Sequence, residues 1–299
     1  MSLLRVRGLG KSFGGVHAVD GIDFDLGAGE LLAFIGPNGA GKSTTFNMIN
    51  GQLHADRGSV DLDGTNLIGL SPRAICRLGV ARTFQIAQTF ASLTVLENVQ
   101  MSVLSHHRQI FSFWMRATQS HLEESMSLLE QVGLLDQADK PTSALAYGDI
   151  KRLELAMALA GRPRLLLMDE PTAGMGSSER HALMSLIKTL VTEKGIAVLF
   201  TEHSMDVVFA FADRVLVLAR GRLIADGSAE QVRDDPKVQQ VYLGSGALSG
   251  SRVGDLVAKP DPSRTVITAP AIATATTTAT MTTTATITAA THSTRKVDV

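Results

Sequence analysis

The stretch GPNGAGKST at Gly36–Thr44 decides the fold of this chain. It satisfies the pattern G-x-x-x-x-G-K-[ST], follows the apolar run Leu31–Ile35 and precedes a helical segment that begins at about Lys42. Glycines let consecutive backbone N–H groups curl around phosphate oxygens, and the N-terminus of a helix adds positive potential. The sequence therefore predicts a phosphate-binding loop between a strand and a helix.

The residues of this loop have predicted contacts with a nucleotide. We expect Lys42 to reach the β- and γ-phosphates and the Ser43 hydroxyl to bind Mg²⁺. The predicted nucleotide-binding residues of the loop are Gly36, Pro37, Asn38, Gly39, Ala40, Gly41, Lys42, Ser43 and Thr44. A phosphate loop alone leaves kinases, GTPases and several classes of ATPase open.

A second signal is the run RLLLMDEP at Arg164–Pro171, which has the pattern of a buried strand ending in two adjacent carboxylates. Neighbouring side chains on a strand point to opposite faces, so Asp169 and Glu170 cannot share one role. We assign Asp169 to Mg²⁺, held directly or through water, and Glu170 to polarising the attacking water.

Strand-like runs alternate with helical segments along the chain. Arg164–Met168 precedes a helix that begins at about Ser177, and Ile196–Thr201 precedes one that begins at about Ser204. This alternation predicts an α/β fold with a mostly parallel sheet. A small antiparallel β layer is predicted from three short alternating segments, Leu3–Arg7, Phe24–Leu26 and Ser59–Leu62.

The segment from about 94 to 161 is helical in pattern and predicts a helical subdomain inserted into the α/β core. One apolar face of this subdomain is predicted to carry Leu122, Met126, Leu129 and Val132. With this insertion, residues 1–244 form one predicted domain that contains the phosphate loop.

The composition changes after Gly244, and from about Thr265 to Thr291 it becomes a run of Thr and Ala. Small side chains offer little apolar surface to offset the entropy of ordering the chain. We therefore expect a disordered tail over 245–299, with a β-aggregating or partner-ordered tail as the alternative.

Composition limits the partners. Lys and Arg total 28 against 29 for Asp and Glu, and this balance argues against a nucleic-acid-binding surface. No run approaches the roughly 20 apolar residues that span a bilayer, and the N-terminus MSLLRVRGLGKSF lacks the apolar core of a secretory signal. Any role at a membrane must therefore go through a partner.

With these motifs in hand, the chain resembles the ATP-binding subunits of ABC transporters. LAYGD at Leu145–Asp149 looks like the signature motif of that family, and the helical run IKRLELAMALA follows it. The resemblance covers about Leu3 to Gly244. It implies further roles for Phe13 as the ring that stacks on adenine, Gln85 as the loop glutamine, Gly174–Gly176 as the loop after the acidic pair, and His203 as the switch histidine.

The resemblance also implies ATP and Mg²⁺ as cofactors and a sandwich of two ATPase subunits. ATP would lie between the phosphate loop of one subunit and Ala146, Tyr147 and Gly148 of the other. The implied catalytic residues are Glu170, His203 and Gln85, and the implied metal ligands are Ser43, Gln85 and Asp169. The sequence leaves open whether the second subunit is an identical or a related chain.

Two departures from the family pattern bear on the sandwich. The signature usually has Ser where this chain has Ala146, which removes a charge-assisted hydrogen bond worth roughly 1.5–3 kcal/mol. Asp149 replaces the usual Gln, and Gly176 stands where the broad family usually has Asp. Gly148 and the following helix N-terminus can still present N–H groups to phosphate.

Within the family, KSFGGVHAVDGIDFDL and the closing VQQVYLG resemble the ATPase subunits of branched-chain amino acid importers. This resemblance implies membrane-spanning permease subunits, an indirect role for a solute-binding protein, and a peripheral location at the cytoplasmic face of the cell membrane. Urea or short-amide importers and lipopolysaccharide exporters share much of the pattern and remain alternatives. A soluble ABC protein of ribosomes or DNA is disfavoured by the single phosphate loop.

An aromatic run in the helical subdomain has two interpretations. QIFSFWMRATQS at Gln109–Ser120 contains Phe111, Phe113, Trp114 and Met115. We expect these side chains to pack internally, and a docking surface for the permease is the alternative.

Overall fold

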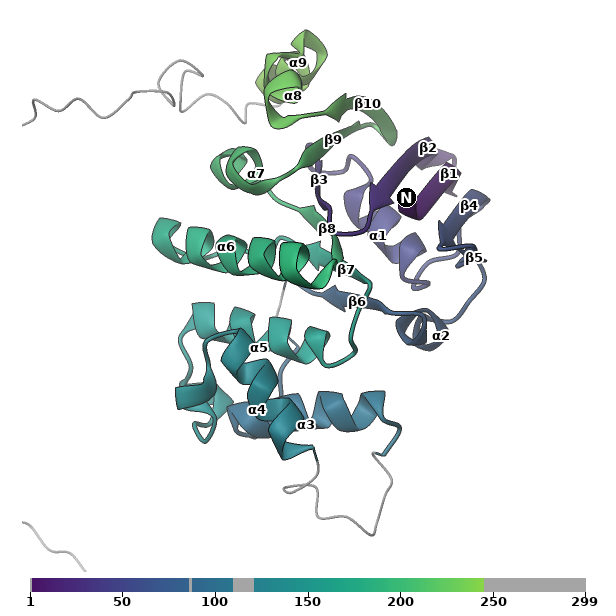
Figure 1. Cartoon of the computed structure of the whole chain (residues 1–299). Helices are drawn as coiled ribbons and strands as arrows, with labels where there is room; N and C mark the ends of the chain where they lie inside the picture. The colour runs from purple at the N-terminus through teal and green to yellow at the C-terminus, as the bar shows by residue number, and fades with distance from the viewer. Residues whose placement is uncertain (1, 86–87, 110–120, 245–299) are drawn as a thin grey trace, which may run out of the picture. The chain divides into compact units, whose positions relative to one another are not determined.

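The computed structural model describes residues 2–85, 88–109 and 121–244. Its central element is a six-stranded sheet with the order β10-β9-β3-β8-β7-β6 (Figure 1). Every neighbouring pair is parallel except β9 and β10, which confirms the predicted mostly parallel sheet. The strands are β3 (Leu31–Ile35), β6 (Val80–Thr83), β7 (Leu165–Asp169), β8 (Ala197–Thr201), β9 (Arg214–Ala219) and β10 (Arg222–Gly227).

The predicted antiparallel layer is a four-stranded sheet with the order β2-β1-β4-β5. Two long strands form most of it, because β1 pairs with β2 almost from end to end. Its strands are β1 (Ser2–Phe13), β2 (Val16–Gly27), β4 (Arg57–Leu62) and β5 (Thr65–Asn66).

The alternation of side chains along the parallel strands creates two hydrophobic cores. In β3, Leu31, Ala33 and Ile35 belong to a core shared with the helices, whereas Leu32 and Phe34 belong to a core shared with the antiparallel sheet. Because both faces of β3 are covered, all five of its residues are apolar and buried.

The helices fall into two groups. In Figure 1, α3, α4 and α5 lie together at one end of the molecule, and α6 lies between α5 and the six-stranded sheet. The first group comprises α3 (Val95–His106), α4 (Leu122–Gln131), the 3-10 turns η2 (Leu135–Gln137) and η3 (Thr142–Ala144), and α5 (Tyr147–Leu159). The others are α1 (Lys42–Ile49), α2 (Pro72–Arg77), α6 (Ser177–Lys194), α7 (Met205–Phe211), α8 (Ala229–Asp234) and α9 (Pro236–Gly244).

The predicted apolar face of α4 is wrong in two of its four residues. Leu129 and Val132 are buried, but Leu122 and Met126 remain 37% and 39% exposed. The stripe that packs against α3 and α5 instead runs through Ser125 and Leu128, so the helix is rotated from the predicted face. The packing of α4 against its neighbours, rather than the spacing of its apolar residues, therefore decides which face is buried.

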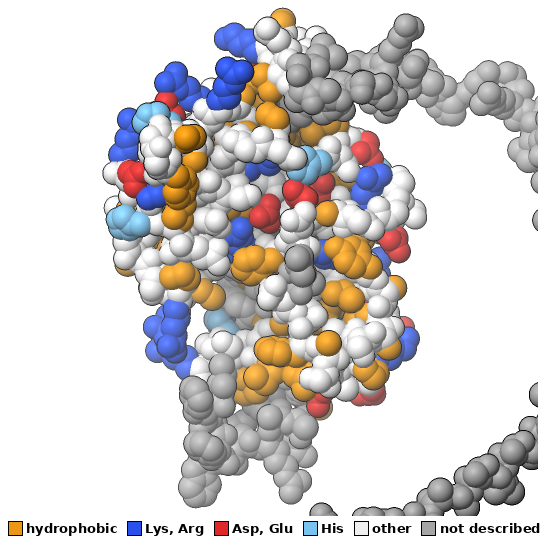
Figure 2. Space-filling model, turned by 180° about the vertical axis from the view of Figure 1, so that it is seen from behind, with side chains coloured by type: hydrophobic (Ala, Val, Ile, Leu, Met, Phe, Trp, Pro, Cys, Tyr) orange, Lys and Arg blue, Asp and Glu red, His pale blue; other side chains and the backbone are white. Residues whose placement is uncertain are grey.

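Two predicted features lie outside the described residues. These are the aromatic run at Phe111–Met115 and the tail at 245–299. Within the described residues, no helix combines the length and the apolar character that crossing a membrane requires. Figure 2 shows one face of the molecule, on which acidic, basic and hydrophobic side chains are interspersed.

Candidate functional site

The phosphate loop connects the carboxyl end of β3 to the start of α1, as the sequence predicts. Two positions in this loop require glycine, because backbone carbonyl oxygens of neighbouring strands lie too close for a side chain. Gly36 has φ 154°, and a Cβ at this position would lie 2.1 Å from the carbonyl oxygen of Leu218. Gly41 has φ 108°, and its Cβ would lie 2.3 Å from the carbonyl oxygen of Ala18. Any side chain at either position would displace the loop from β9 or β2.

Lys42 is buried beneath this loop. Its Nζ donates hydrogen bonds to the carbonyl oxygens of Gly36 at 2.7 Å and Pro37 at 3.3 Å. Burial lowers the pKa of Lys42, and the nearby carboxylates of Glu170 and Asp169 offset only part of that effect. The ammonium group thus lies in a poorly hydrated position, where an anionic ligand is a strong partner.

A cavity of about 340 Å³ gathers most of the predicted site, a volume suited to a small ligand. The loop and the ends of β1, β7 and β8 contribute its walls. The lining residues are Phe13, Ala18, Asn38, Gly39, Ala40, Gly41, Lys42, Ser43, Thr44, Asp169, Glu170 and His203. The Phe13 side chain is among the large hydrophobic residues left exposed, at 49%, so one wall presents an aromatic ring to solvent.

Asp169 is held from both neighbouring strands. Its Oδ1 accepts a hydrogen bond from the Thr201 hydroxyl at 2.8 Å, and its Oδ2 accepts one from Arg82 Nη2 at 3.2 Å. Arg82 also donates to Asn47 Oδ1 at 2.6 Å, which ties β6 to α1. The carboxylate therefore has a fixed position at the edge of the sheet.

Glu170 lies just beyond the end of β7 and has φ 48°, a left-handed conformation that is uncommon for a non-glycine residue. Its Oε2 accepts a hydrogen bond from Gln85 Nε2 at 2.8 Å, and its Oε1 lies 2.9 Å from His203 Nε2. The two acids are thus separated by the turn at Glu170 as well as by strand alternation. The predicted catalytic side chains of Gln85 and His203, from two other segments of the chain, therefore meet at the carboxylate of Glu170, the third predicted catalytic residue.

The sequence of the chain matches a known protein family. Residues 19–173 match the sequence profile of the ABC transporter family. The chain belongs to the ABC transporter family. Residues 222–247 additionally match the profile described as a branched-chain amino acid ATP-binding cassette transporter.

Relatives extend the match over most of this ABC cassette. It is 38% identical over 252 residues to the high-affinity branched-chain amino acid transport ATP-binding protein LivG of Escherichia coli K12, covering 81% of this chain and 98% of LivG. The corresponding protein BraF of Pseudomonas aeruginosa is 37% identical over 252 residues, with the same coverage. The protein is thus an ATP-hydrolysing cassette of a transporter.

Solved structures agree with this assignment. An ATP-binding cassette of an ABC transporter in its ADP conformation has a TM-score of 0.75 and 32% identity, covering 82% of this chain and 99% of its own. A nucleotide-free cassette has a TM-score of 0.73 and 32% identity, covering 81% of this chain and 99% of its own. The fold class predicted from the sequence is confirmed.

Gln85 is held by a pair of charged residues that were not among the predicted site residues. In α5 of the cassette, buried Lys151 donates from Nζ to the carbonyl oxygens of Phe84 at 2.9 Å and Gln85 at 2.7 Å. Glu154 accepts the N–H of Phe84 at 2.7 Å, and burial raises the pKa of this carboxyl. The sequence signal was a Lys and a Glu three residues apart in the helical run after the signature motif, a spacing that places both side chains on one face of a helix.

Glu202 was also missed. Its buried carboxylate accepts hydrogen bonds from the N–H and the hydroxyl of Thr172, at 2.9 and 2.6 Å, and from the N–H of His203 at 3.1 Å. It joins the loop after the acidic pair to the segment that carries the histidine. Its sequence signal was a carboxylate placed directly between a buried strand and His203.

The signature segment lies apart from this cavity. Ala146 precedes α5, and Tyr147 and Gly148 begin it. The ring of Tyr147 packs beside Gly174, where a Cβ would lie 3.4 Å from the ring. None of the three signature residues lines the cavity that contains Lys42. One chain therefore does not bring its own signature residues to its own phosphate loop.

Proposed function

We propose that this cassette binds and hydrolyses MgATP in a two-subunit sandwich and thereby drives an importer of branched-chain or related amino acids. The observation that carries the catalytic part is the Glu170 carboxylate between Gln85 and His203, beside the cavity that contains Lys42. The cargo is inferred from the profile match at 222–247 and from the names of LivG and BraF.

The donor set at the edge of the sheet fits Mg²⁺. Ser43 offers a hydroxyl, Asp169 a carboxylate, and Gln85 an amide oxygen that stays available while its Nε2 donates to Glu170. These are hard oxygen ligands, the type that Mg²⁺ prefers. When bound with the nucleotide, this ion would neutralise charge on the β- and γ-phosphates.

Side chains and backbone groups of this chain perform the other steps, which are nucleotide binding and activation of the attacking water. Lys42 and the loop N–H groups bind phosphate oxygens, and Phe13 provides an exposed ring for adenine to stack on. Glu170 accepts a proton from the attacking water or orients it, and His203 and Gln85 hold that carboxylate in place.

The second half of the site comes from a partner in this proposal. Because Ala146, Tyr147 and Gly148 lie apart from the cavity that contains Lys42, a second cassette must present them to bound ATP. Hydrolysis is then possible only when two cassettes associate. The other partners are permease subunits and, through them, a solute-binding protein, which place the cassette at the cytoplasmic face of the membrane.

Reconstitution tests both parts of the proposal. The cassette would be combined in proteoliposomes with candidate permease subunits and a related cassette, and ATP-dependent uptake of leucine would be measured with a leucine-specific solute-binding protein. We expect leucine uptake that is lost in Glu170→Gln. Uptake of urea or short amides without leucine would refute the cargo, and leucine uptake by Glu170→Gln at the wild-type rate would refute the assigned catalysis.

A further inference from the structure

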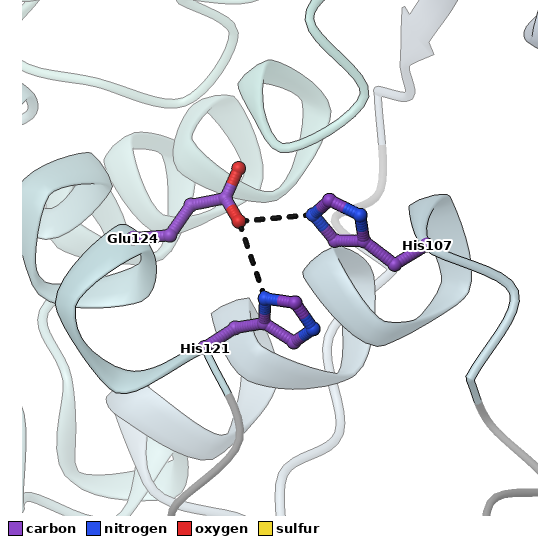
Figure 3. A group of neighbouring side chains, drawn as sticks. All are labelled: His107, His121 and Glu124. Carbon is purple, nitrogen blue, oxygen red and sulfur yellow. Dashed lines mark hydrogen bonds and ion pairs between the residues drawn. The ribbon is translucent and has the colours of Figure 1, made fainter.

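Three potential metal ligands meet where α3 ends and α4 begins. His107 follows α3, His121 precedes α4, and Glu124 lies in the first turn of α4. Glu124 Oε2 is 3.0 Å from His107 Nε2 and 3.5 Å from His121 Nδ1, so both rings converge on one oxygen (Figure 3). In the part of the chain that the structure describes, this is the one such group of His, Cys, Asp or Glu ligand atoms within 4.8 Å of one another.

The hydrogen bond to Gln109 fixes the tautomer of neutral His121. Gln109 Oε1 lies 2.7 Å from His121 Nε2, and a carbonyl oxygen can only accept, so Nε2 carries the proton. In the neutral ring, Nδ1 then carries a lone pair and lies 3.5 Å from a carboxylate oxygen. A metal ion bound by both atoms would stabilise this arrangement of two acceptors.

A second residue orients the carboxylate. Arg162 Nη2 donates to Glu124 Oε1 at 3.0 Å, which leaves Oε2 directed at the two rings. Metal-binding histidines and carboxylates commonly have such outer partners, and Gln109 and Arg162 supply them here.

The two rings lie close enough together to bind one ion, since the ligand atoms of all three side chains lie within 4.8 Å of one another. The rings of His107 and His121 are stacked with centroids 4.3 Å apart and planes inclined by 2°. An imidazole nitrogen binds a metal in the plane of its ring, so one ring must turn out of the stack when the ion binds. All three side chains are 22–31% exposed, so an ion can reach them from solvent.

We propose that His107, His121 and Glu124 form a Zn²⁺ site that ties the end of α3 to the start of α4. Two imidazoles and one carboxylate are typical zinc ligands, with water completing the shell, whereas Mg²⁺ and Ca²⁺ prefer oxygen alone. Zinc–ligand bonds of about 2.1 Å place tetrahedral ligand atoms about 3.4 Å apart. The distances of 3.0 and 3.5 Å at Glu124 already lie near that value.

The test uses the full chain, freed of metal by a chelator and titrated with Zn²⁺ by calorimetry. The key variant is the double substitution His107→Asn/His121→Asn. Asn retains polarity and tolerates the left-handed backbone of His121, which has φ 54°, so the variant should fold. His54→Asn is the matched control, because His54 is an exposed histidine outside the cluster.

We expect the wild-type protein and His54→Asn to bind one more Zn²⁺ per chain than the double variant. Gln109→Leu should weaken that binding by about 10-fold, as loss of an outer partner does. Zinc at about 100 times its Kd should raise the Tm of the wild type by about 5 °C without affecting that of the double variant. Equal zinc stoichiometry and equal Tm shifts in the wild type and the double variant would overturn the proposal.

Discussion

Glu170→Gln tests the division of labour between the two acids most directly. The Glu170 carboxylate accepts from both Gln85 and His203, at 2.8 and 2.9 Å. A glutamine amide has the same shape but only one acceptor oxygen and no basicity. The substitution should therefore keep the cavity and the loop intact while removing the group that polarises water.

The expected loss is that of a positioned general base. Such groups contribute about 10²–10⁴-fold to a rate, which corresponds to about 2.7–5.4 kcal/mol in the activation free energy. ATP binding should change little, because Lys42 and Asp169 keep their contacts. Glu170→Gln should consequently hold ATP and stay in the closed two-subunit state.

Asp169→Asn provides the contrast. It weakens the acceptor for the Thr201 hydroxyl and removes the negative charge opposite Arg82, whose side chain is only 9% exposed. It also removes the carboxylate assigned to Mg²⁺. We therefore expect a higher Mg²⁺ requirement and weaker MgATP binding, rather than a trapped ATP complex.

Two measurements separate these outcomes. Phosphate release gives the turnover rate, and size-exclusion chromatography with MgATP gives nucleotide occupancy and the fraction of dimer, with the related cassette added if the pair is heteromeric. If Glu170→Gln hydrolyses ATP at the wild-type rate, or loses ATP binding as severely as Asp169→Asn, the assignment is wrong.

Three further predictions concern other parts of the chain. Lys42→Ala should impair MgATP binding and hydrolysis, because it removes the ammonium held under the phosphate loop, and unchanged turnover at saturating ATP would count against this site. Lys151→Met should leave the carbonyl oxygens of Phe84 and Gln85 without their donor and Glu154 without its cation, so we expect the Tm to fall by roughly 5–10 °C and phosphate release to slow. Both quantities staying at wild-type values would show that α5 does not hold Gln85. Deleting 265–299 should leave ATPase activity and Tm nearly intact, since this run of small residues should bury no core, and a large drop in Tm on calorimetry would contradict that expectation.

The sequence alone determined the parts of this protein whose chemistry is contiguous along the chain. The loop at Gly36–Thr44, the acids Asp169 and Glu170, and the strand–helix alternation around them were readable because each depends on neighbouring residues and a short period. The family resemblance added Gln85 and His203, whose roles no local pattern indicates. The structure places both beside Glu170.

Only the tertiary structure decided which distant side chains meet. Lys151 and Glu154 reach Phe84 and Gln85 across more than sixty residues of sequence, and no local period encodes that pairing. The packing of α4 against two other helices likewise left Leu122 and Met126 exposed, although their spacing predicted a core face. Local periodicity specifies that a helix has faces, but the neighbours that a fold assembles around the helix decide which face is buried.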